Sequence, residues 1–346
     1  MKTNAAILTE LNKPLTIGEI EMPEHLEHGQ VLVRVHYSGI CGSQLGEIAG
    51  AKGPDKYLPH LLGHEGGGVV EKIGSGVTIV KPGDHVVMHW RPGPGIQAAT
   101  PKYTWNGKPL NAGWVTTFNE RAIISENRLT PVPKDLDLKT ATLYGCALTT
   151  AHGVIANDAK VKTGESVVIF GAGGVGISVV HMCSLAGANP IIVTDINDFK
   201  LKHALKLGAT HAINVTREDA RAKIIELFPK GVDVAIDTTG MKSIMELSYE
   251  ITHSTGRTVL VGVPKAEDKK ITIDSMPLHF GKKITGSHGG DSEPAHDIPR
   301  LLGLQNSGRL KAEELITHEY ALEQVNEALE MVKKGDALRV VLRMVD

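Results

Sequence analysis

Cys41, His64 and Cys146 carry side chains of the kinds that bind zinc, two thiols and one imidazole. A catalytic zinc has three protein ligands and keeps its fourth position open for water or substrate, and this set meets that requirement. The three residues lie far apart along the chain, so their spacing alone does not indicate a shared site. A single buried cysteine is more often a small apolar side chain, which is the role expected for Cys183 in a predicted helix. Residue types alone therefore leave zinc binding open.

A glycine-rich turn of sequence GAGGVG, at residues 171–176, predicts a dinucleotide-binding site. The turn follows a predicted apolar strand and opens a predicted helix, which is the context that such a site requires. The first glycine permits a tight turn, the second lets backbone N–H groups approach a pyrophosphate, and the last lets helix and strand pack closely. The predicted cofactor contacts in the turn are Gly171, Gly173, Gly174, Val175 and Gly176. A structural turn without a ligand is the alternative interpretation.

Asp195 ends the next predicted strand, 19 residues after Gly176. An acid at this place accepts hydrogen bonds from the adenosine ribose hydroxyls and repels a 2′-phosphate. The sequence therefore favours NAD over NADP.

The strand and helix patterns change near residue 148, which predicts two domains in an α/β protein. Residues 1–130 consist of short strands and turns, typical of a partly closed, β-rich sheet. From residue 148, apolar strands alternate with helices, as in the doubly wound parallel sheet of a Rossmann domain. A helix-rich tail ends in a strand that could return to the first half. We expect a catalytic domain at residues 1–147 and 288–346 and a cofactor domain at 148–287.

Composition excludes several classes of function. The 346 residues include 37 basic and 39 acidic side chains, a formal net charge of −2, so nucleic acid is an unlikely partner. No apolar run approaches the roughly 18 residues of a membrane span, and the first residues lack a secretion signal. Three cysteines at long separations argue against a disulfide framework. We expect a cytoplasmic protein.

Three motifs resemble those of the zinc-dependent alcohol dehydrogenases, within the medium-chain dehydrogenase/reductase superfamily. They are Gly63-His64-Glu65-x-x-Gly68 with Gly74 and Val77, then Gly39-Ile-Cys41-Gly-Ser43, and Gly145-Cys146-Ala-Leu-Thr-Thr150. The motifs occur in the family's order, and the likeness spans nearly the whole chain. It implies a GroES-like catalytic domain beside the Rossmann domain. It also implies that Cys41, His64 and Cys146 bind one catalytic zinc, with Glu65 beside them as a tuning group or transient ligand.

The resemblance assigns further residues to the cofactor and substrate. The implied cofactor contacts are Thr150, Val175, Lys200, Val261, Val263 and Arg339, the last of them at the pyrophosphate. Lys200 and Arg339 could equally be solvated surface charges. Ser43 is implied to relay the substrate proton, and Trp90 and Phe118 to line the substrate pocket.

The chain departs from the family at several positions. Residues 85–115 lack the four cysteines that hold a structural zinc in many relatives, so we expect that segment to be held by packing. Gly46 replaces a histidine of the proton relay, which leaves water, Glu47 or His36 as the outlet. Gly42 replaces a basic residue that often touches the pyrophosphate, which favours faster release of the cofactor.

These features predict a zinc- and NAD-dependent enzyme that transfers hydride between an alcohol and its aldehyde or ketone. Polyol or amino-alcohol oxidation by the same family is the first alternative. A zinc-free quinone or alkene reductase and a catalytically silent NAD-binding protein are the others. The resemblance also implies a homodimer or homotetramer.

Overall fold

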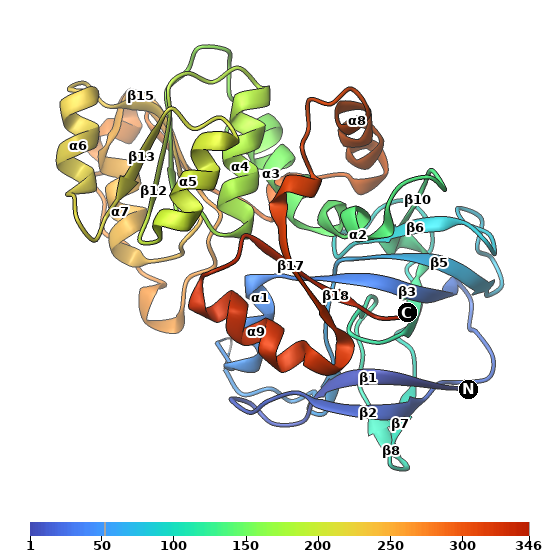
Figure 1. Cartoon of the computed structure of the whole chain (residues 1–346). Helices are drawn as coiled ribbons and strands as arrows, with labels where there is room; N and C mark the ends of the chain where they lie inside the picture. The colour runs from blue at the N-terminus through green and yellow to red at the C-terminus, as the bar shows by residue number, and fades with distance from the viewer. Residues whose placement is uncertain (52, 346) are drawn as a thin grey trace. The chain divides into compact units, whose positions relative to one another are not determined.

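The chain forms two compact units (Figure 1). A computed structural model describes residues 1–51 and 53–345. Unit 1 comprises Met1–Ala147, Glu293–Ser307 and Lys311–Asp346, and unit 2 comprises Leu148–Ser292 and Gly308–Leu310. Residues 288–292, expected in the catalytic domain, thus lie in unit 2. The reason is that the turn η6 (Gly289–Asp291) packs on η3 (Val154–Asp158), where the Asn157 amide donates to the Gly290 carbonyl at 2.9 Å.

Unit 1 is built on two sheets within the described residues. One sheet has the order β4-β1-β2-β7-β8, and the other has the order β10-β6-β5-β3-β18-β17, with β9 also paired to β3. The strands are β1 (Lys2–Leu8), β2 (Thr16–Glu21), β3 (Gln30–Ile40), β4 (His60–Leu61), β5 (Gly66–Ile73), β6 (His85–Met88), β7 (Tyr103–Trp105), β8 (Lys108–Leu110), β9 (Arg121–Ser125), β10 (Leu129–Val132), β17 (Ile316–Ala321) and β18 (Arg339–Arg343). The helices are α1 (Gly42–Ile48), α2 (Leu138–Ala141), α8 (Pro294–Asn306) and α9 (Val325–Lys334), and α3 (Ala147–Gly153) begins at the unit's last residue before unit 2.

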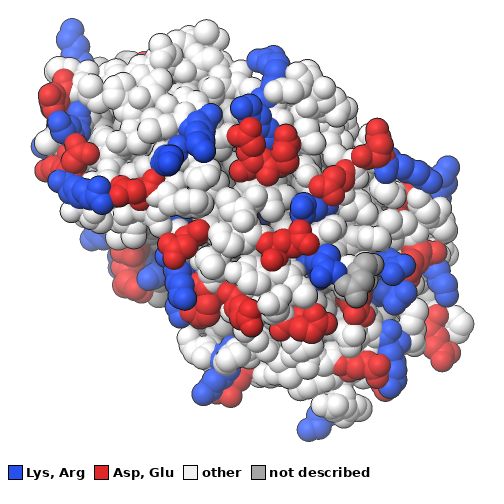
Figure 2. Space-filling view, in the orientation of Figure 1, with Lys and Arg blue, Asp and Glu red and all other residues white. Residues whose placement is uncertain are grey.

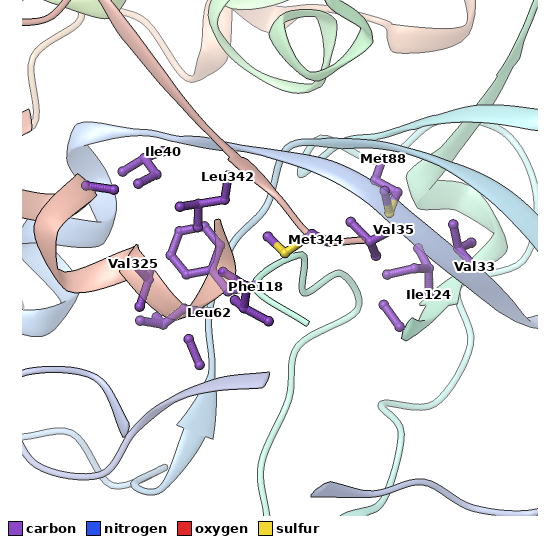
Figure 3. Close-up of a cluster of buried hydrophobic side chains, with 14 of the residues drawn as sticks. Val33, Val35, Ile40, Leu62, Met88, Phe118, Ile124, Val325, Leu342 and Met344 are labelled. Carbon is purple, nitrogen blue, oxygen red and sulfur yellow. The ribbon is translucent and has the colours of Figure 1, made fainter. Parts of the chain in front are cut away.

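The hydrophobic core of unit 1 anchors the loops that carry the candidate ligands. Side chains of β3, β18 and α9 meet there, among them Val35, Leu342 and Val325 (Figure 3). Ile40, which directly precedes Cys41, and Leu62, two residues before His64, belong to the same core. Full burial of one such side chain contributes about 1.5–3 kcal/mol, so both loops start from firmly held positions.

Unit 2 is a parallel sheet with the strand order β13-β12-β11-β14-β15-β16. Counted along the chain, this order is 3-2-1-4-5-6, that of a doubly wound Rossmann sheet, which confirms the predicted fold class. The strands are β11 (Val167–Phe170), β12 (Ile191–Asp195), β13 (His211–Asn214), β14 (Val232–Asp237), β15 (Thr252–Leu260) and β16 (Lys283–Gly286). The helices are α4 (Gly174–Leu185), α5 (Asp198–Lys206), α6 (Ala220–Leu227) and α7 (Lys242–Glu250). The central strands are apolar on both sides because helices cover both faces.

Charged side chains of both signs are interspersed on the face of the molecule shown in Figure 2. No broad area of that face is covered by basic side chains alone, which agrees with the near-neutral composition. Across the described residues, no helix combines the length and apolar character needed to cross a membrane.

Candidate metal centre and nucleotide-binding turn

The structure brings Cys41, His64 and Cys146 together in unit 1. Their ligand atoms all lie within 4.8 Å of one another, and the described residues contain no other group of three or more potential ligands that could hold a metal ion. Cys41 precedes the first turn of α1, His64 lies in the loop between β4 and β5, and Cys146 lies between the η2 turn (Thr142–Gly145) and α3. Three loops from distant parts of the sequence therefore converge on one point.

Glycines beside two of the ligands allow this convergence. Gly63 has a φ of +87°, and a Cβ there would lie 2.3 Å from the Thr117 hydroxyl. A Cβ at Gly145 would lie 2.3 Å from the Met88 carbonyl oxygen. Side chains at these positions would push His64 and Cys146 away from the site, so the glycines of both motifs have a steric reason.

The chemistry of the donor set suits zinc. A hydrogen bond from Cys146 holds the pKa of the Cys41 thiol well below its usual range. The same hydrogen bond, together with burial, raises the pKa of Cys146. His64 also hydrogen-bonds to Cys41. Two cysteine sulfurs and one imidazole within 4.8 Å of one another are the ligand types of a catalytic zinc that keeps one position open, so the residues present fit that ion.

Glu65 and Arg339 form a buried ion pair next to the ligands. A guanidinium Nη2 of Arg339, on β18, donates to Glu65 Oε1, and the side chains are only 3% and 0% exposed. Burial raises the pKa of Glu65, and the neighbouring guanidinium lowers it. The second carboxylate oxygen, Oε2, and Arg339 Nε have no hydrogen-bond partner among the described residues. Arg339 is thus a buried counter-charge, not a solvated surface residue.

Gln44 is a site residue that the sequence analysis missed. Its side chain is 1% exposed, and its amide contacts both the Cys41 backbone and the His64 ring. The sequence did carry one signal for this residue. Gln44 follows a candidate ligand by three positions, and a polar side chain there can accept a hydrogen bond from the backbone N–H at the start of the helix.

The remaining residues predicted in unit 1 differ in exposure. Ser43 is exposed beside Cys41, and Trp90 is half-buried with the Arg91 guanidinium 5.8 Å from its ring centre. Phe118 is fully buried in the core (Figure 3), so it offers no surface to a substrate here. Of the two residues named as possible proton outlets, Glu47 interacts electrostatically with His64. The charged groups that act on His36 are Arg34, His85 and Glu71, outside the site.

The glycine turn of unit 2 has the geometry of a phosphate-binding turn. Gly171 has a φ of +91°, and a Cβ at Gly176 would lie 1.9 Å from the Gly171 carbonyl oxygen, so neither position accepts a side chain. A Cβ at Gly173 would meet nothing within 4 Å, which leaves open space over the first turn of α4. Backbone N–H groups and the positive end of the helix dipole face an anion at such a place.

Asp195 lies at the end of β12, and its carboxylate braces this turn. One oxygen accepts the Ala172 N–H at 2.7 Å and the other accepts the Asn197 N–H at 2.9 Å. Each oxygen has a further lone pair, so the carboxylate can still accept ribose hydroxyls.

The other predicted cofactor contacts of unit 2 occupy several places in the fold. Thr150 is buried on α3, Val175 is half-buried in the first turn of α4, and Lys200 is half-buried in the first turn of α5. Val261 and Val263 follow β15, at the same sheet edge as the glycine turn, and Val263 is 79% exposed. An apolar side chain that exposed at the ligand-binding edge of a doubly wound sheet is well placed to contact a cofactor.

Comparison with known proteins gives the family. Residues 27–134 match the alcohol dehydrogenase GroES-like domain, and residues 174–306 match the zinc-binding dehydrogenase domain. Alcohol dehydrogenase class-2 isozyme 2 of Oryctolagus cuniculus is 33% identical over 374 residues, an alignment covering 99% of this chain and 98% of that protein. The chain belongs to the zinc-dependent alcohol dehydrogenases. This alcohol dehydrogenase is accordingly an oxidoreductase of the medium-chain dehydrogenase/reductase superfamily, as the motifs predicted.

Solved structures agree over the whole length of this alcohol dehydrogenase. An alcohol dehydrogenase zinc-binding domain protein from Burkholderia ambifaria has a TM-score of 0.92 at 32% identity, with 100% of both chains covered. Benzyl alcohol dehydrogenase from Acinetobacter calcoaceticus has a TM-score of 0.90 at 28% identity, again with 100% of both chains covered.

In this alcohol dehydrogenase the segment at residues 89–99 is held by hydrogen bonds as well as by packing. The Glu126 carboxylate accepts the N–H groups of Ile96 at 2.8 Å and Ile79 at 2.9 Å, and the Thr78 N–H as well. Ser125 accepts the Ala98 N–H at 2.8 Å, and Arg128 donates to the Trp90 carbonyl at 2.8 Å. Packing alone, as expected from the sequence, is therefore an incomplete account of this segment.

Proposed function

We propose that this alcohol dehydrogenase uses NAD and a single zinc ion per chain, held by Cys41, His64 and Cys146, to interconvert an alcohol and its aldehyde or ketone. The observation that supports this most directly is the convergence of the three ligand atoms within 4.8 Å. Asp195, beside the glycine turn, supports NAD over NADP. The chain has only three cysteines in all, which supports one zinc per chain.

The chain's own residues then divide the work of the reaction. Zinc, when bound, supplies a Lewis acid that polarises the substrate oxygen. The exposed Ser43 hydroxyl receives the substrate proton and passes it on, to water, Glu47 or His36. Arg339 pairs with the Glu65 carboxylate beside the ligands and counteracts the effect of burial on its pKa. Thr150 and Val175 would hold the nicotinamide of bound NAD, and that ring would supply the hydride acceptor.

Metal content and NADH formation test this proposal together. The full chain should contain about one zinc and should form NADH with some member of a panel of primary, secondary and polyhydroxy alcohols. Benzyl alcohol belongs in the panel because a structural relative bears that name. Turnover of alditols or threonine, without turnover of simple primary alcohols, would favour the polyol or amino-alcohol alternative.

Two cysteine variants make the test specific. Cys146→Ala should lose both zinc and activity, whereas Cys183→Ala, a change at a fully buried cysteine of α4 in unit 2, should keep both. Zinc retained at one equivalent by Cys146→Ala would contradict the ligand assignment. Two zinc ions in the unmodified chain would contradict the proposed count.

We also propose a homodimer or homotetramer, in the cytoplasm. Strand β16 lies at the edge of the parallel sheet, and Met276 and Phe280 just before it are 61% and 71% exposed. Apolar side chains beside a sheet edge support a subunit contact there. Light scattering should show an oligomer that Phe280→Asp weakens, and a monomeric unmodified chain would contradict the proposal.

The three free thiols support a reducing compartment.

A further inference from the structure

Gln44 connects two of the three ligand residues through its amide group. Its Oε1 accepts the Cys41 backbone N–H at 2.9 Å, and its Nε2 lies 2.6 Å from His64 Nδ1. The side chain is only 1% exposed, so water does not compete freely for these bonds. The orientation of the His64 ring is therefore coupled to the start of α1.

The direction of the amide follows from its two partners. A backbone N–H can only donate, so the Gln44 atom that faces Cys41 must be the oxygen. The –NH₂ group then faces His64, and because –NH₂ can only donate, Nδ1 must accept. A ring that accepts at Nδ1 carries its proton at Nε2, and His64 does hydrogen-bond to the Cys41 sulfur.

Zinc requires the opposite arrangement of the ring. Because Gln44 occupies Nδ1, the nitrogen available to a metal is Nε2, and a neutral imidazole that gives this lone pair away carries its proton at Nδ1. Nδ1–H then faces the –NH₂ group of Gln44, donor against donor. Rotating the amide by half a turn only moves the conflict to the Cys41 N–H. The Cys41 N–H and the His64 Nδ1–H thus compete for the one oxygen of Gln44, and the –NH₂ group is left facing the other donor. A zinc-bound histidine normally donates to a carboxylate, a carbonyl or water.

We propose that Gln44 is a positioning residue that opposes the zinc-bound tautomer of His64, so that this chain holds its zinc more weakly and exchanges it faster than its ligands alone would allow. The inference rests on the proposed assignment of Cys41, His64 and Cys146 as the ligands. Partners of zinc-bound histidines change metal affinity by about 10–100-fold, which sets the expected size of the effect.

Two substitutions of Gln44 test this inference in the full-length, zinc-loaded enzyme. Gln44→Glu offers one oxygen to the Cys41 N–H and the other to Nδ1–H, so it should bind zinc about 10–100-fold more tightly. Its added negative charge would favour zinc in any case, so this variant alone does not decide. Gln44→Met has a similar length and removes the opposing –NH₂ without adding charge. Gln44→Met also removes the acceptor of the Cys41 N–H. Because this hydrogen bond is lost both with and without zinc, its loss does not change the zinc dissociation constant.

The zinc dissociation constant and release rate would be measured by competition with a chromophoric chelator. Tighter binding and slower release in Gln44→Met than in the unmodified chain support the inference, and equal or weaker binding overturns it. Lack of zinc in the unmodified chain and both variants would instead overturn the ligand assignment, and the inference with it. The two failures are thus distinguishable.

The histidine tautomer gives a readout that a merely structural role would not change. Nitrogen-15 NMR of the zinc-stripped protein should show His64 protonated at Nε2 in the unmodified chain and at Nδ1 in Gln44→Glu. His89 serves as an internal reference, because its Nδ1 faces the Arg91 carbonyl at 2.7 Å and must be protonated there in both proteins. The same His64 tautomer in both proteins would overturn the inference.

Discussion

Glu126→Gln should destabilise the segment at residues 89–99 without touching the metal ligands. In the native protein one carboxylate oxygen of Glu126 accepts the N–H groups of Thr78 and Ile79, and the other accepts the Ile96 N–H. The side chain is fully buried. A glutamine of the same shape has only one acceptor oxygen. If that oxygen keeps the first pair of bonds, the amide –NH₂ meets the Ile96 N–H as a second donor.

The size of the effect follows from these bonds. An unpaired buried donor costs about 1–3 kcal/mol, and the two remaining bonds each lose about 1 kcal/mol when their acceptor loses its charge. We therefore expect a loss of about 3–5 kcal/mol in the free energy of unfolding. In a domain of about 200 residues this lowers Tm by about 6–20 °C.

Calorimetry and hydrogen exchange would measure this prediction. Tm should fall, and the amides of Gly93, Ile96 and Ala98 should exchange faster, because all three donate across this junction. Glu120→Gln is a matched control, because Glu120 also accepts two hydrogen bonds, but at an exposed site, where a change of about 0.5 kcal/mol or less is expected.

An unchanged Tm, or unchanged exchange at Ile96, would refute the reasoning. Acid gives a second check. Burial alone would raise the pKa of Glu126, but the N–H groups of Ile96, Thr78 and Ile79 outweigh it and hold that pKa below its usual range. The stabilisation is therefore complete above the unfolded value of about 4.3 and is lost as pH falls through the lower folded value. The difference between Glu126→Gln and the unmodified chain should shrink at acidic pH, and a constant difference would contradict this.

Three further predictions follow from the same kind of reasoning. Asp195→Ala should reduce the preference for NAD over NADP, measured as the ratio of kcat/KM values, by about 10–100-fold. This is the size expected for the loss of a hydrogen bond to a charged group. An unchanged ratio would show that the acid does not contact the ribose. Arg339→Met should lower the free energy of unfolding, measured with urea, by about 3–5 kcal/mol, because it leaves Glu65 buried without its counter-charge. The double variant with Glu65→Gln should recover part of that loss. No recovery would argue against the ion pair. Burial lowers the pKa of His89 to about 4, so the native ring stays neutral at pH values where the unfolded ring, with a pKa of about 6.5, gains a proton. The free energy of unfolding should therefore fall by about 3 kcal/mol as pH drops from 6.5 to 4. His89→Gln should remove that component, and an equal pH slope in both proteins would contradict it.

Short-range sequence patterns predicted the features of the fold that depend on neighbouring residues. The glycine turn and Asp195 belong to one strand–turn–helix–strand segment, so their roles could be inferred from short-range spacing. The two-part fold followed from the change in strand and helix rhythm near residue 148. Comparison with known structures confirms that fold class.

Long-range features needed the folded chain. Cys41, His64 and Cys146 are brought together by three loops whose convergence no spacing rule describes, and only their resemblance to a family suggested it. The burial of Phe118 depends on strands and a helix from both ends of the sequence. The place of Gln44 three residues after Cys41 gave only a partial signal, because its role in the site depends on a histidine that follows 20 positions later.

The position of Arg339 has a consequence for biosynthesis. Strand β18 pairs with the end of β3, at residues 37–40, so that this stretch lacks one of its neighbours until residues 339–343 have been translated, whereas the pairing of β3 with β5 and β9 needs only N-terminal residues. Until then the Glu65 carboxylate lacks the Arg339 guanidinium that pairs with it in the folded protein. Truncation before residue 339 should therefore destabilise unit 1, because it removes both a strand from the sheet and the counter-charge of a buried carboxylate.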